Sequence, residues 1–357
     1  MKILSLFDWM ACWYEALVRA WIKIDKYYAS EIDKYAIQIA KKNHPDIIEV
    51  WDVQNLWYEW DLLKSSEWRQ QKNIRVAGVW PIDLLIWGSP CQWFSVAWKM
   101  LNFDDPRSKL FFEYVRLLKE IKPKYFLLEN VKMKKEWQDI ISRELWVEPI
   151  EINSSLVSAQ NRRRLYRTNI PNVSQPKDKG ILLKDILQEN VGEGYYLTKQ
   201  QFDMIANRKW YERPLENVKW PYDKIWTLTT HVWKFSNGMK LVSMRGGELR
   251  IRQATKQWYI VAERWDGISL AYPNSITRRG RVCKWKSNTL TTQWDSLVYD
   301  GTIRRLTPIE CERLQTLPDN YTEWVSDTQR YKMLWNWWTV DVIAHIFSFI
   351  GKHTAIL

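Results

Sequence analysis

One cysteine of the chain lies in a short segment that could expose a reactive thiol. Cys91 is part of Gly-Ser-Pro-Cys-Gln-Trp-Phe-Ser at positions 88–95, which closely follows the apolar run 82–86. A cysteine on a loop at the carboxyl end of a sheet can be exposed and ionised, whereas a cysteine buried in a core is inert. Because a lone cysteine in such a place is more often structural, its role depends on what other segments bring to it.

Two further segments carry polar side chains next to apolar runs. Glu129 and Asn130 follow the apolar run 125–128, and Gln160 opens the segment Gln-Asn-Arg-Arg-Arg at 160–164. A carboxylate can hold the polar edge of a substrate and neutralise charge that develops on it, and an arginine can support the same groups. Taken alone, the arginines fit a solvated basic face equally well.

Acidic residues also follow the second and third predicted strands. Glu31 comes after the predicted strand 24–30, and Asp52 comes after the predicted strand 47–50. In an open α/β sheet, ligands bind at these carboxyl ends. A carboxylate there can accept hydrogen bonds from two vicinal hydroxyl groups of a ligand. Either acid by itself could equally be a surface residue.

Hydrophobic periodicity predicts an α/β protein with a smaller, loop-rich second lobe. The polar stretch 55–79 is interpreted as a surface insertion. The other strands are expected at 2–6, 82–86, 125–128, 148–153 and 165–168. Helices are expected through Leu17 and Ala20 and at 33–42, 108–121, 307–314 and 339–349. The predicted parts of the chain are 1–175, 176–302 and 303–357.

Composition narrows the class of protein. With 357 residues and a hydrophobic fraction of 46%, the chain can bury a core and form two lobes. No run approaches the roughly 18 apolar residues that a membrane span needs, and the start does not resemble a signal peptide. We therefore expect a cytoplasmic protein. The four cysteines and four histidines are scattered, so we predict no disulfide framework and no metal site.

The positive charge is concentrated in one part of the chain. The formal net charge is +12, and the segment 176–302 carries 21 Lys and Arg residues against 13 Asp and Glu residues. Such a segment suits a polyanion, because each neutralised phosphate releases counterions. Ordinary solubilising charge is the alternative interpretation.

The tryptophan content is anomalous. The chain has 25 tryptophans and only 12 glycines, although glycine normally makes up about 7% of residues. We interpret eighteen of the tryptophans as glycines of the native protein. On this interpretation the source organism reads one codon as glycine, with the UGA stop triplet as the candidate, and the written sequence translates that codon as tryptophan. A protein genuinely rich in tryptophan is the alternative. The eighteen positions are Trp9, Trp13, Trp21, Trp51, Trp80, Trp87, Trp93, Trp98, Trp146, Trp226, Trp233, Trp258, Trp265, Trp285, Trp294, Trp324, Trp335 and Trp337. The tryptophans interpreted as native are Trp57, Trp60, Trp68, Trp137, Trp210, Trp220 and Trp338.

Taken together, these motifs resemble those of the DNA (cytosine-5) methyltransferase family over nearly the whole chain. The family's Pro-Cys-Gln nucleophile motif is similar to 90–92, and its Glu-Asn-Val and Gln-x-Arg-x-Arg motifs are similar to 129–131 and 160–164. The turn at 7–13 resembles the family's Phe-x-Gly cofactor motif, and 335–340 resembles its Gly-Asn-Gly motif. The chain departs from the family by carrying tryptophan at several of these glycine positions.

The resemblance implies a Rossmann-like, S-adenosylmethionine-dependent methyltransferase fold with a small target-recognition domain. On this interpretation 1–175 forms the catalytic and cofactor-binding domain, 176–302 the target-recognition domain, and 303–357 the helices that complete the catalytic domain. The implied catalytic residues are Cys91, Glu129, Arg162 and Arg164. The implied cofactor-binding residues are Phe7, Asp8, Trp9, Met10, Glu31, Ile32, Asp52, Val53, Ser89, Pro90, Asn336 and Val340. The implied substrate-binding residues are Gln92, Ser95, Asn130 and Gln160.

The resemblance also implies a mechanism and partners. Cys91 would attack C6 of a cytosine flipped out of double-stranded DNA, after which C5 takes the methyl group of S-adenosylmethionine. The family allows a cognate restriction endonuclease as a partner, and we expect a bacterial or phage-encoded, nucleoid-associated monomer. Three alternatives stay open: a tRNA-directed member of the family, an inactive DNA-binding relative if the tryptophans are real, and a nicotinamide-dependent oxidoreductase. The last leaves Cys91 and the arginine motif unexplained.

Overall fold

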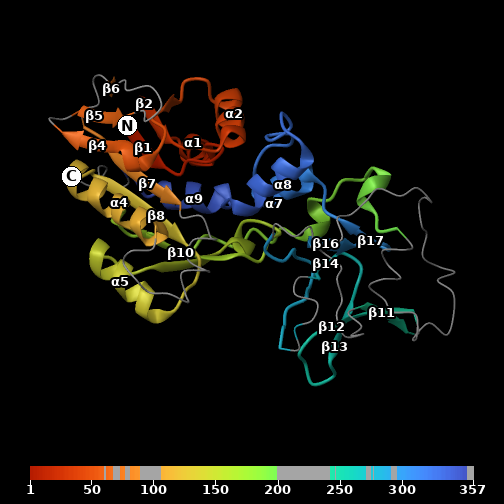
Figure 1. Cartoon of the computed structure of the whole chain (residues 1–357). Coiled ribbons are helices and arrows are strands. Elements are labelled where there is room, and N and C mark those ends of the chain that lie inside the picture. Colours follow the sequence, from red (N-terminus) through yellow and green to blue (C-terminus); the bar gives the residue numbers. More distant parts are fainter. Residues whose placement is uncertain are drawn as a thin grey trace.

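The computed structural model of the chain has a large sheet domain beside a smaller lobe (Figure 1). Among the described residues, no helix is long and apolar enough to cross a membrane. The structure describes residues 1–59, 62–66, 73–76, 81–88, 106–198, 242–245, 247–270, 275, 277–290 and 296–351.

Seven strands form the large sheet in the order β3-β2-β1-β7-β8-β10-β9. They are β1 (Lys2–Leu6), β2 (Lys26–Ser30), β3 (Ile48–Glu49), β7 (Leu84–Gly88), β8 (Tyr125–Asn130), β9 (Ile150–Asn153) and β10 (Arg163–Thr168). Neighbours pair in parallel, except that β10 runs antiparallel to both β8 and β9. The amino end of β10 therefore lies at the sheet edge where β7 and β8 end.

Helices cover both faces of this sheet, because alternate residues of a strand point to opposite sides. In β1, Ile3 belongs to one buried apolar cluster and Leu4 to the other, and Ile86 and Leu85 repeat this division in β7. The first cluster includes residues of α1 (Cys12–Arg19), α2 (Lys34–Asn43) and α9 (Val340–Phe347), and the second includes residues of α4 (Pro106–Ile121) and α5 (Lys135–Leu145). The predicted α/β class is confirmed.

The predicted elements of this domain correspond closely to the observed ones. The strand expected at 24–30 begins at Lys26, and Asp33 caps α2 as expected by accepting hydrogen bonds from the backbone N–H groups of Tyr35 and Ala36. The prediction missed α5 and α8 (Asp327–Asn336). The stretch interpreted as a surface insertion contains a three-stranded antiparallel sheet of β4 (Leu56–Glu59), β5 (Leu62–Ser66) and β6 (Asn73–Val76).

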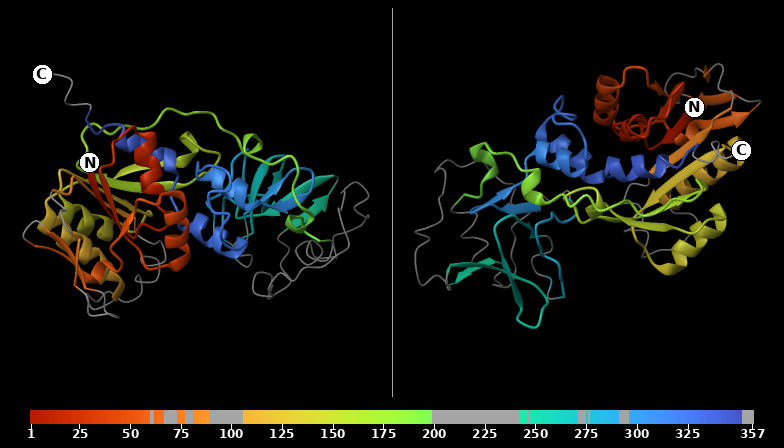
Figure 2. Two further views of the ribbon diagram at one scale, coloured as in Figure 1. Left: turned by 90° about the horizontal axis from the view of Figure 1, so that it is seen from above. Right: turned by 180° about the vertical axis from the view of Figure 1, so that it is seen from behind.

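The second lobe is built from two small antiparallel sheets with their own apolar cluster, which includes Leu249 and Ile268. One contains β11 (Val242–Arg245), β12 (Glu248–Arg252) and β13 (Tyr259–Ala262), and the other β14 (Asp266–Ser269), β15 (Val282–Cys283), β16 (Ser296–Tyr299) and β17 (Ile303–Arg305). Short 3-10 turns at Val53–Asn55, Ser154–Leu156, Leu183–Asp185 and Glu193–Tyr195 connect other segments. Figure 2 shows this lobe beside the large sheet in both views. The division of the chain at 175 and 302 stays a prediction.

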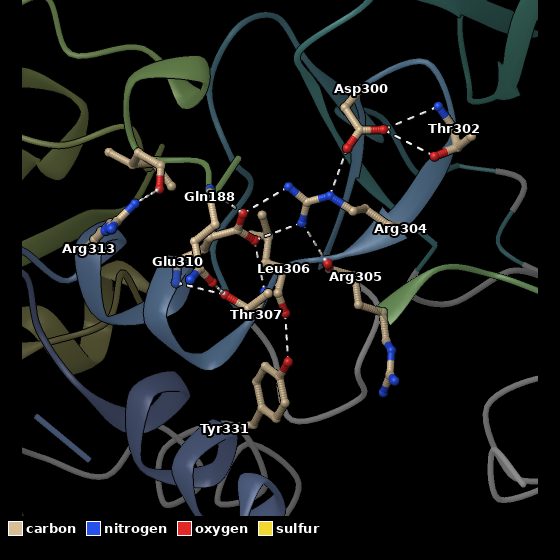
Figure 3. Close-up of polar contacts among 11 residues, drawn as sticks. Gln188, Asp300, Thr302, Arg304, Arg305, Leu306, Thr307, Glu310, Arg313 and Tyr331 are labelled. Atoms are coloured by element: carbon tan, nitrogen blue, oxygen red, sulfur yellow. Dashed lines mark hydrogen bonds and ion pairs between the residues drawn. The ribbon is translucent and has the colours of Figure 1, made fainter. Parts of the chain in front are cut away.

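A buried ionic network joins the second lobe to the helix α7 (Pro308–Leu314), which returns toward the large domain. Arg304 of β17 donates to Asp300 at 2.7 Å and to both oxygens of Glu310 at 2.8 Å (Figure 3). Glu310 also accepts from the backbone N–H of Thr307, whose own side chain caps α7. Because Arg304 and Glu310 are both buried and fully hydrogen-bonded, the last strand of the lobe and the start of α7 are held in one geometry.

Candidate active site

A cavity of about 460 Å³ opens at the carboxyl ends of β1, β2, β3 and β7, a size typical of small-molecule sites. Helix α8 and the segment after it border the cavity from the other side, which brings residues far apart in sequence together. The lining residues are Phe7, Trp9, Ser30, Glu31, Ile32, Asp33, Trp51, Asp52, Val53, Gln54, Gly88, Leu110, Lys332, Asn336, Trp337 and Trp338.

Glu31 is held rigidly at the end of β2. One carboxylate oxygen accepts from the backbone N–H groups of Ile32 and Asp33 at 2.8 Å each, and the other accepts from the N–H of Trp9 at 2.9 Å. Burial raises the pKa of Glu31, and these three hydrogen bonds oppose the shift by stabilising the anion. A carboxylate offers about four lone-pair sites, so Glu31 keeps capacity for a hydroxyl of a ligand.

The other residues predicted to bind a cofactor divide into three groups. Phe7, Trp9, Glu31, Ile32, Asp52, Val53 and Asn336 line the cavity. Asp8, Met10 and Val340 are buried and do not line it. Ser89 and Pro90 lie outside the described residues, as do Cys91, Gln92 and Ser95.

Helix α8 contributes two polar side chains to the cavity, Asn336, which was predicted, and Lys332, which was not. The side-chain amide of Asn336 donates to the carbonyl of Lys332 at 3.1 Å, and its Oδ1 is buried with no hydrogen-bond partner among the described residues. Lys332 forms an ion pair with Asp33 at 2.8 Å and was not predicted. No motif marks Lys332 in the sequence, because it reaches the cavity only through the packing of α8.

Two more acids lie near Glu31: Asp8 is buried and Glu49 is half-buried. Burial raises the pKa of Asp8 to about 7, opposed by hydrogen bonds from Ser5 and Tyr27 and supported by the charge of Glu31. Burial likewise raises the pKa of Glu49 to about 8. Burial therefore makes both acids hold a proton more tightly than exposed carboxyl groups do. Among the described residues, no group of His, Cys, Asp or Glu side chains could hold a metal ion.

The second part of the site lies where β8 ends. Glu129 is buried, and its Oε1 lies 3.0 Å from Nε of Arg164. The pairing register explains the contact: Glu129 lies opposite Tyr166 of antiparallel β10, so Arg164, near the start of that strand, reaches the end of β8. Burial raises the pKa of Glu129, whereas Arg164, a hydrogen bond from Trp338 and the charge of Arg162 oppose the shift.

The remaining predicted residues of this part surround the pair. Arg162 is buried and donates to the backbone carbonyl of Trp335 at 3.3 Å. Asn130 is buried, and its Oδ1 accepts from Arg167 at 3.5 Å. Gln160 is fully buried, and neither polar atom of its side chain has a hydrogen-bond partner among the described residues. Such an amide is costly to bury unless another group satisfies it.

Gly88 connects the two parts of the site. It is the last residue of β7, lines the cavity and lies opposite Glu129 in the β7–β8 register. A β-carbon on Gly88 would lie 1.6 Å from Cζ2 of Trp338, so only glycine fits beside that indole. In the sequence, Cys91 follows three residues later. Neither the Gly88–Trp338 contact nor the role of Trp338 beside Glu129 was predicted.

The mostly parallel sheet, the cavity at its carboxyl edge and the buried acid–arginine pair define a Rossmann-like methyltransferase fold. Residues 1–143 and 152–352 match the family described as C-5 cytosine-specific DNA methylase. The chain therefore belongs to the C-5 cytosine-specific DNA methylase family, as the sequence motifs predicted.

Individual relatives agree with this assignment. The type II methyltransferase M1.ScrFI of Lactococcus lactis subsp. cremoris is 29% identical over 336 residues, covering 88% of this chain and 69% of the relative. The orphan methyltransferase M.SPRI of Bacillus phage SPR is 26% identical over 444 residues, covering 98% and 97%. The structure of Entamoeba histolytica methyltransferase EhMeth covers 99% of this chain and 98% of its own, with a TM-score of 0.60 at 15% identity, which shows a shared fold.

S-adenosylmethionine is the methyl donor of this family, and the cavity residues fit it. The free acceptor capacity of Glu31 suits a ribose hydroxyl, and the unpartnered Oδ1 of Asn336 suits an N–H or O–H donor. The mainly apolar remainder of the lining suits an adenine ring. Bound there, the donor supplies an electrophilic methyl group on a sulfonium.

Proposed function

We propose that the chain methylates C5 of a cytosine flipped out of duplex DNA, through a covalent adduct at Cys91. One relationship carries the proposal: Arg164 lies 3.0 Å from Glu129 at the end of β8, beside the strand β7 that leads to Cys91. Because Cys91 follows Gly88 by three residues in the chain, the proposal puts the nucleophile at the same sheet edge as Glu129 and Arg164, next to the donor cavity.

Each residue has a distinct role in the proposed reaction. The Cys91 thiolate adds to C6, which turns C5 into an enamine-like nucleophile. Glu129 holds N3 and the exocyclic amine, and its raised pKa favours the protonated form that can donate to N3. Arg164 positions Glu129, and Arg162 supports the base and the thiolate. C5 takes the methyl group from the sulfonium, which becomes a neutral thioether. Water then accepts the C5 proton, the electron pair of that C–H bond forms the C5–C6 double bond, and the Cys91 sulfur leaves C6 as a thiolate.

The same proposal assigns the substrate-binding residues. The cytosine must leave the helical stack, because C6 is inaccessible to a thiol within a duplex. The unpartnered amide of Gln160 and the side chain of Asn130 are candidates to hold the extruded nucleotide, together with Gln92 and Ser95. The basic segment 176–302 would contact phosphates and read base edges in the major groove.

The residues that line the cavity give the proposed cofactor-binding site. We propose that Glu31 binds the ribose and Asp52 the adenine amino group, with Phe7, Trp9, Ile32, Val53 and Asn336 lining the donor. Asp8, Met10 and Val340 would act through packing and hydrogen bonds behind the cavity. We keep Ser89 and Pro90 as proposed contacts on the basis of the motif alone. We also propose that the protein acts as a monomer. A cognate restriction endonuclease as its partner is a separate proposal.

The experiment is transfer of tritiated methyl groups from S-adenosylmethionine to DNA, using the chain with glycine at the eighteen positions. Cys91→Ser should abolish transfer, whereas Cys283→Ser, which changes a half-buried cysteine of the second lobe, should leave it nearly unchanged. Retained transfer in Cys91→Ser would refute the nucleophile. Bisulfite sequencing of host DNA after expression would then give the recognised site. A parallel arm with tRNA separates the tRNA-directed alternative, since transfer to tRNA alone would contradict a DNA substrate.

A further inference from the structure

Tryptophan occupies the left-handed backbone region at several described positions. The backbone angle φ lies between 53° and 75° at seven of them. L-residues rarely adopt this region, because the β-carbon approaches the following carbonyl oxygen, and a bulky residue there is an outlier. The seven positions are Trp9, Trp21, Trp51, Trp146, Trp258, Trp265 and Trp285.

All seven belong to the eighteen tryptophans that the sequence places at glycine positions. The described tryptophans that we interpret as native are Trp57, Trp137 and Trp338, and none of these three has a positive φ. Among the described tryptophans, a positive φ therefore occurs at seven of the twelve placed at glycine positions and at none of the three interpreted as native. The two criteria are different in kind, because one uses neighbouring residue types and the other uses dihedral angles.

Two of the seven terminate helices in the way glycine does. After α1, the N–H of Trp21 donates to the carbonyl of Val18, and the N–H of Ile22 donates to that of Leu17, both at 3.0 Å. This is the Schellman arrangement, in which the left-handed residue is usually glycine. Trp146 occupies the corresponding left-handed position after α5, with φ 58° and ψ 27°.

Packing does not compensate for the strain at these helix ends. The Trp21 side chain is 95% exposed and that of Trp146 is 90% exposed. A large apolar side chain normally offsets an unfavourable backbone by burying its surface, and these two bury almost none. Among the described residues, no contact around Trp21 or Trp146 therefore accounts for an indole there.

Buried members of the eighteen show a different conflict. Trp13, Trp87 and Trp337 are almost fully buried, and their indole N–H groups have no hydrogen-bond partner among the described residues. Buried tryptophans usually satisfy this donor, and leaving it unpaired is costly. Trp338, interpreted as native, instead donates to Glu129. Trp324 and Trp335 show neither conflict.

We infer that the working protein carries glycine at the seven left-handed positions and at Trp13, Trp87 and Trp337, and that its donor cavity is lined accordingly by backbone. Trp9, Trp51 and Trp337 all line that cavity. Glycine at these points keeps the N–H of residue 9 on Glu31 and lets a ligand approach the chain closely. The inference that these positions carry glycine does not depend on the proposed reaction. The expected effect on donor binding does depend on the proposed function.

Peptide masses from the protein purified from the cell that encodes it test the residue identities without any assay of activity. Trypsin releases two adjacent peptides, 136–143 with Trp137 and 144–162 with Trp146. We expect the second to be lighter than written by about 129 Da, the difference between the indolylmethyl side chain of tryptophan and the hydrogen atom of glycine, and the first to have its written mass. If both have their written masses, or both are lighter, the inference is overturned.

Donor binding tests the consequence for the cavity. Isothermal titration with S-adenosylmethionine compares the written chain with a chain carrying glycine at Trp9, Trp51 and Trp337. We expect binding to tighten by roughly tenfold or more, because strain and bulk are removed from the cavity wall. Equal affinity of the two chains would overturn this consequence. Two single variants test the effect on folding. Trp21→Gly should raise Tm, because it relieves a left-handed backbone, and Trp137→Gly should lower Tm, because it places glycine inside α5. A shift of Tm in the same direction for both variants would count against the inference.

Discussion

Nε of Arg164 lies 3.0 Å from Oε1 of Glu129, across the boundary between the antiparallel strand β10 and the end of β8. The pair depends on the one reversed strand of the large sheet. A parallel β10 would place its first residues at the opposite edge, far from the end of β8. The reversal therefore gives the acid a cation partner at the edge where the donor cavity opens.

Replacing Arg164 by methionine should reduce methyl transfer. We expect kcat/KM to fall about 10²-fold, because Glu129 loses the cation that positions it. Arg164 lowers the pKa of Glu129, so its removal raises that pKa further. The alkaline limb of the pH profile should therefore move to higher pH if protonated Glu129 serves as the donor to N3. Rates of tritium transfer across pH 6–9 measure both effects.

The adjacent residue provides the control for this prediction. Arg163 is exposed and pairs with Glu151 at 3.2 Å, so Arg163→Met should change neither rate nor pH profile appreciably. Equal losses in the two variants would mean that general positive charge on β10 matters, and that the specific contact to Glu129 does not.

The sequence was sufficient to predict this part of the fold for a physical reason. Strands such as β8 are buried on both faces and read as continuous apolar runs, so the polar residues that follow them mark the sheet edge. Glu129 and Glu31 stand out in this way. Helix α8 was missed because its mixed apolar and charged residues give only a weak helical periodicity. Helix α5 was overlooked although Trp137, Ile140, Ile141 and Leu145 stand at helical spacing in the sequence.

Contacts made by tertiary packing could not be predicted in the same way. Lys332 reaches Asp33 from almost the other end of the chain, and Trp338 packs against Gly88. Neither pair has a spacing or a motif that relates its members. The family motifs supplied the residue types of the site, but which of Asp8, Met10 and Val340 would face the cavity depended on side-chain direction, and the structure buries all three.

Alanine at position 88 should disrupt the site. A β-carbon there would lie 1.6 Å from the Trp338 ring, so the indole must move away from Glu129. We expect Gly88→Ala to lower Tm and to weaken S-adenosylmethionine binding, measured by thermal unfolding and titration. Gly192→Ala is the matched control, because its nearest neighbour would be 3.9 Å away. Unchanged binding in Gly88→Ala would contradict the tight contact with Trp338.

Asp8 should make stability fall as the pH rises. Its pKa is about 7 in the folded protein against an ordinary 3.8, so the folded state keeps a proton that the unfolded chain releases. The free energy of unfolding therefore decreases between these pH values, by on the order of 4 kcal/mol. Asp8→Asn can still accept from Tyr27 and should flatten this decrease, as measured by urea unfolding at pH 4, 5, 6 and 7.

An exposed aspartate gives the comparison for Asp8. Asp25 pairs with the N-terminal ammonium group at 2.7 Å, which lowers its pKa, so its contribution to stability has the opposite sign. Asp25→Asn should leave the decrease above pH 4 in place. If Asp8→Asn and the parent chain lose stability equally over this range, Asp8 does not hold a proton in the folded state.

Breaking the ionic network between the second lobe and α7 should be strongly destabilising. Arg304→Met leaves the buried carboxylate of Glu310 without its cation, and removing one member of a buried pair typically costs about 3–5 kcal/mol. Arg250→Met removes a pair with half-exposed Glu248, which should cost less than about 1 kcal/mol. Urea unfolding of the two variants measures the difference. Similar losses would show that the contact between Arg304 and Glu310 does not hold β17 to α7.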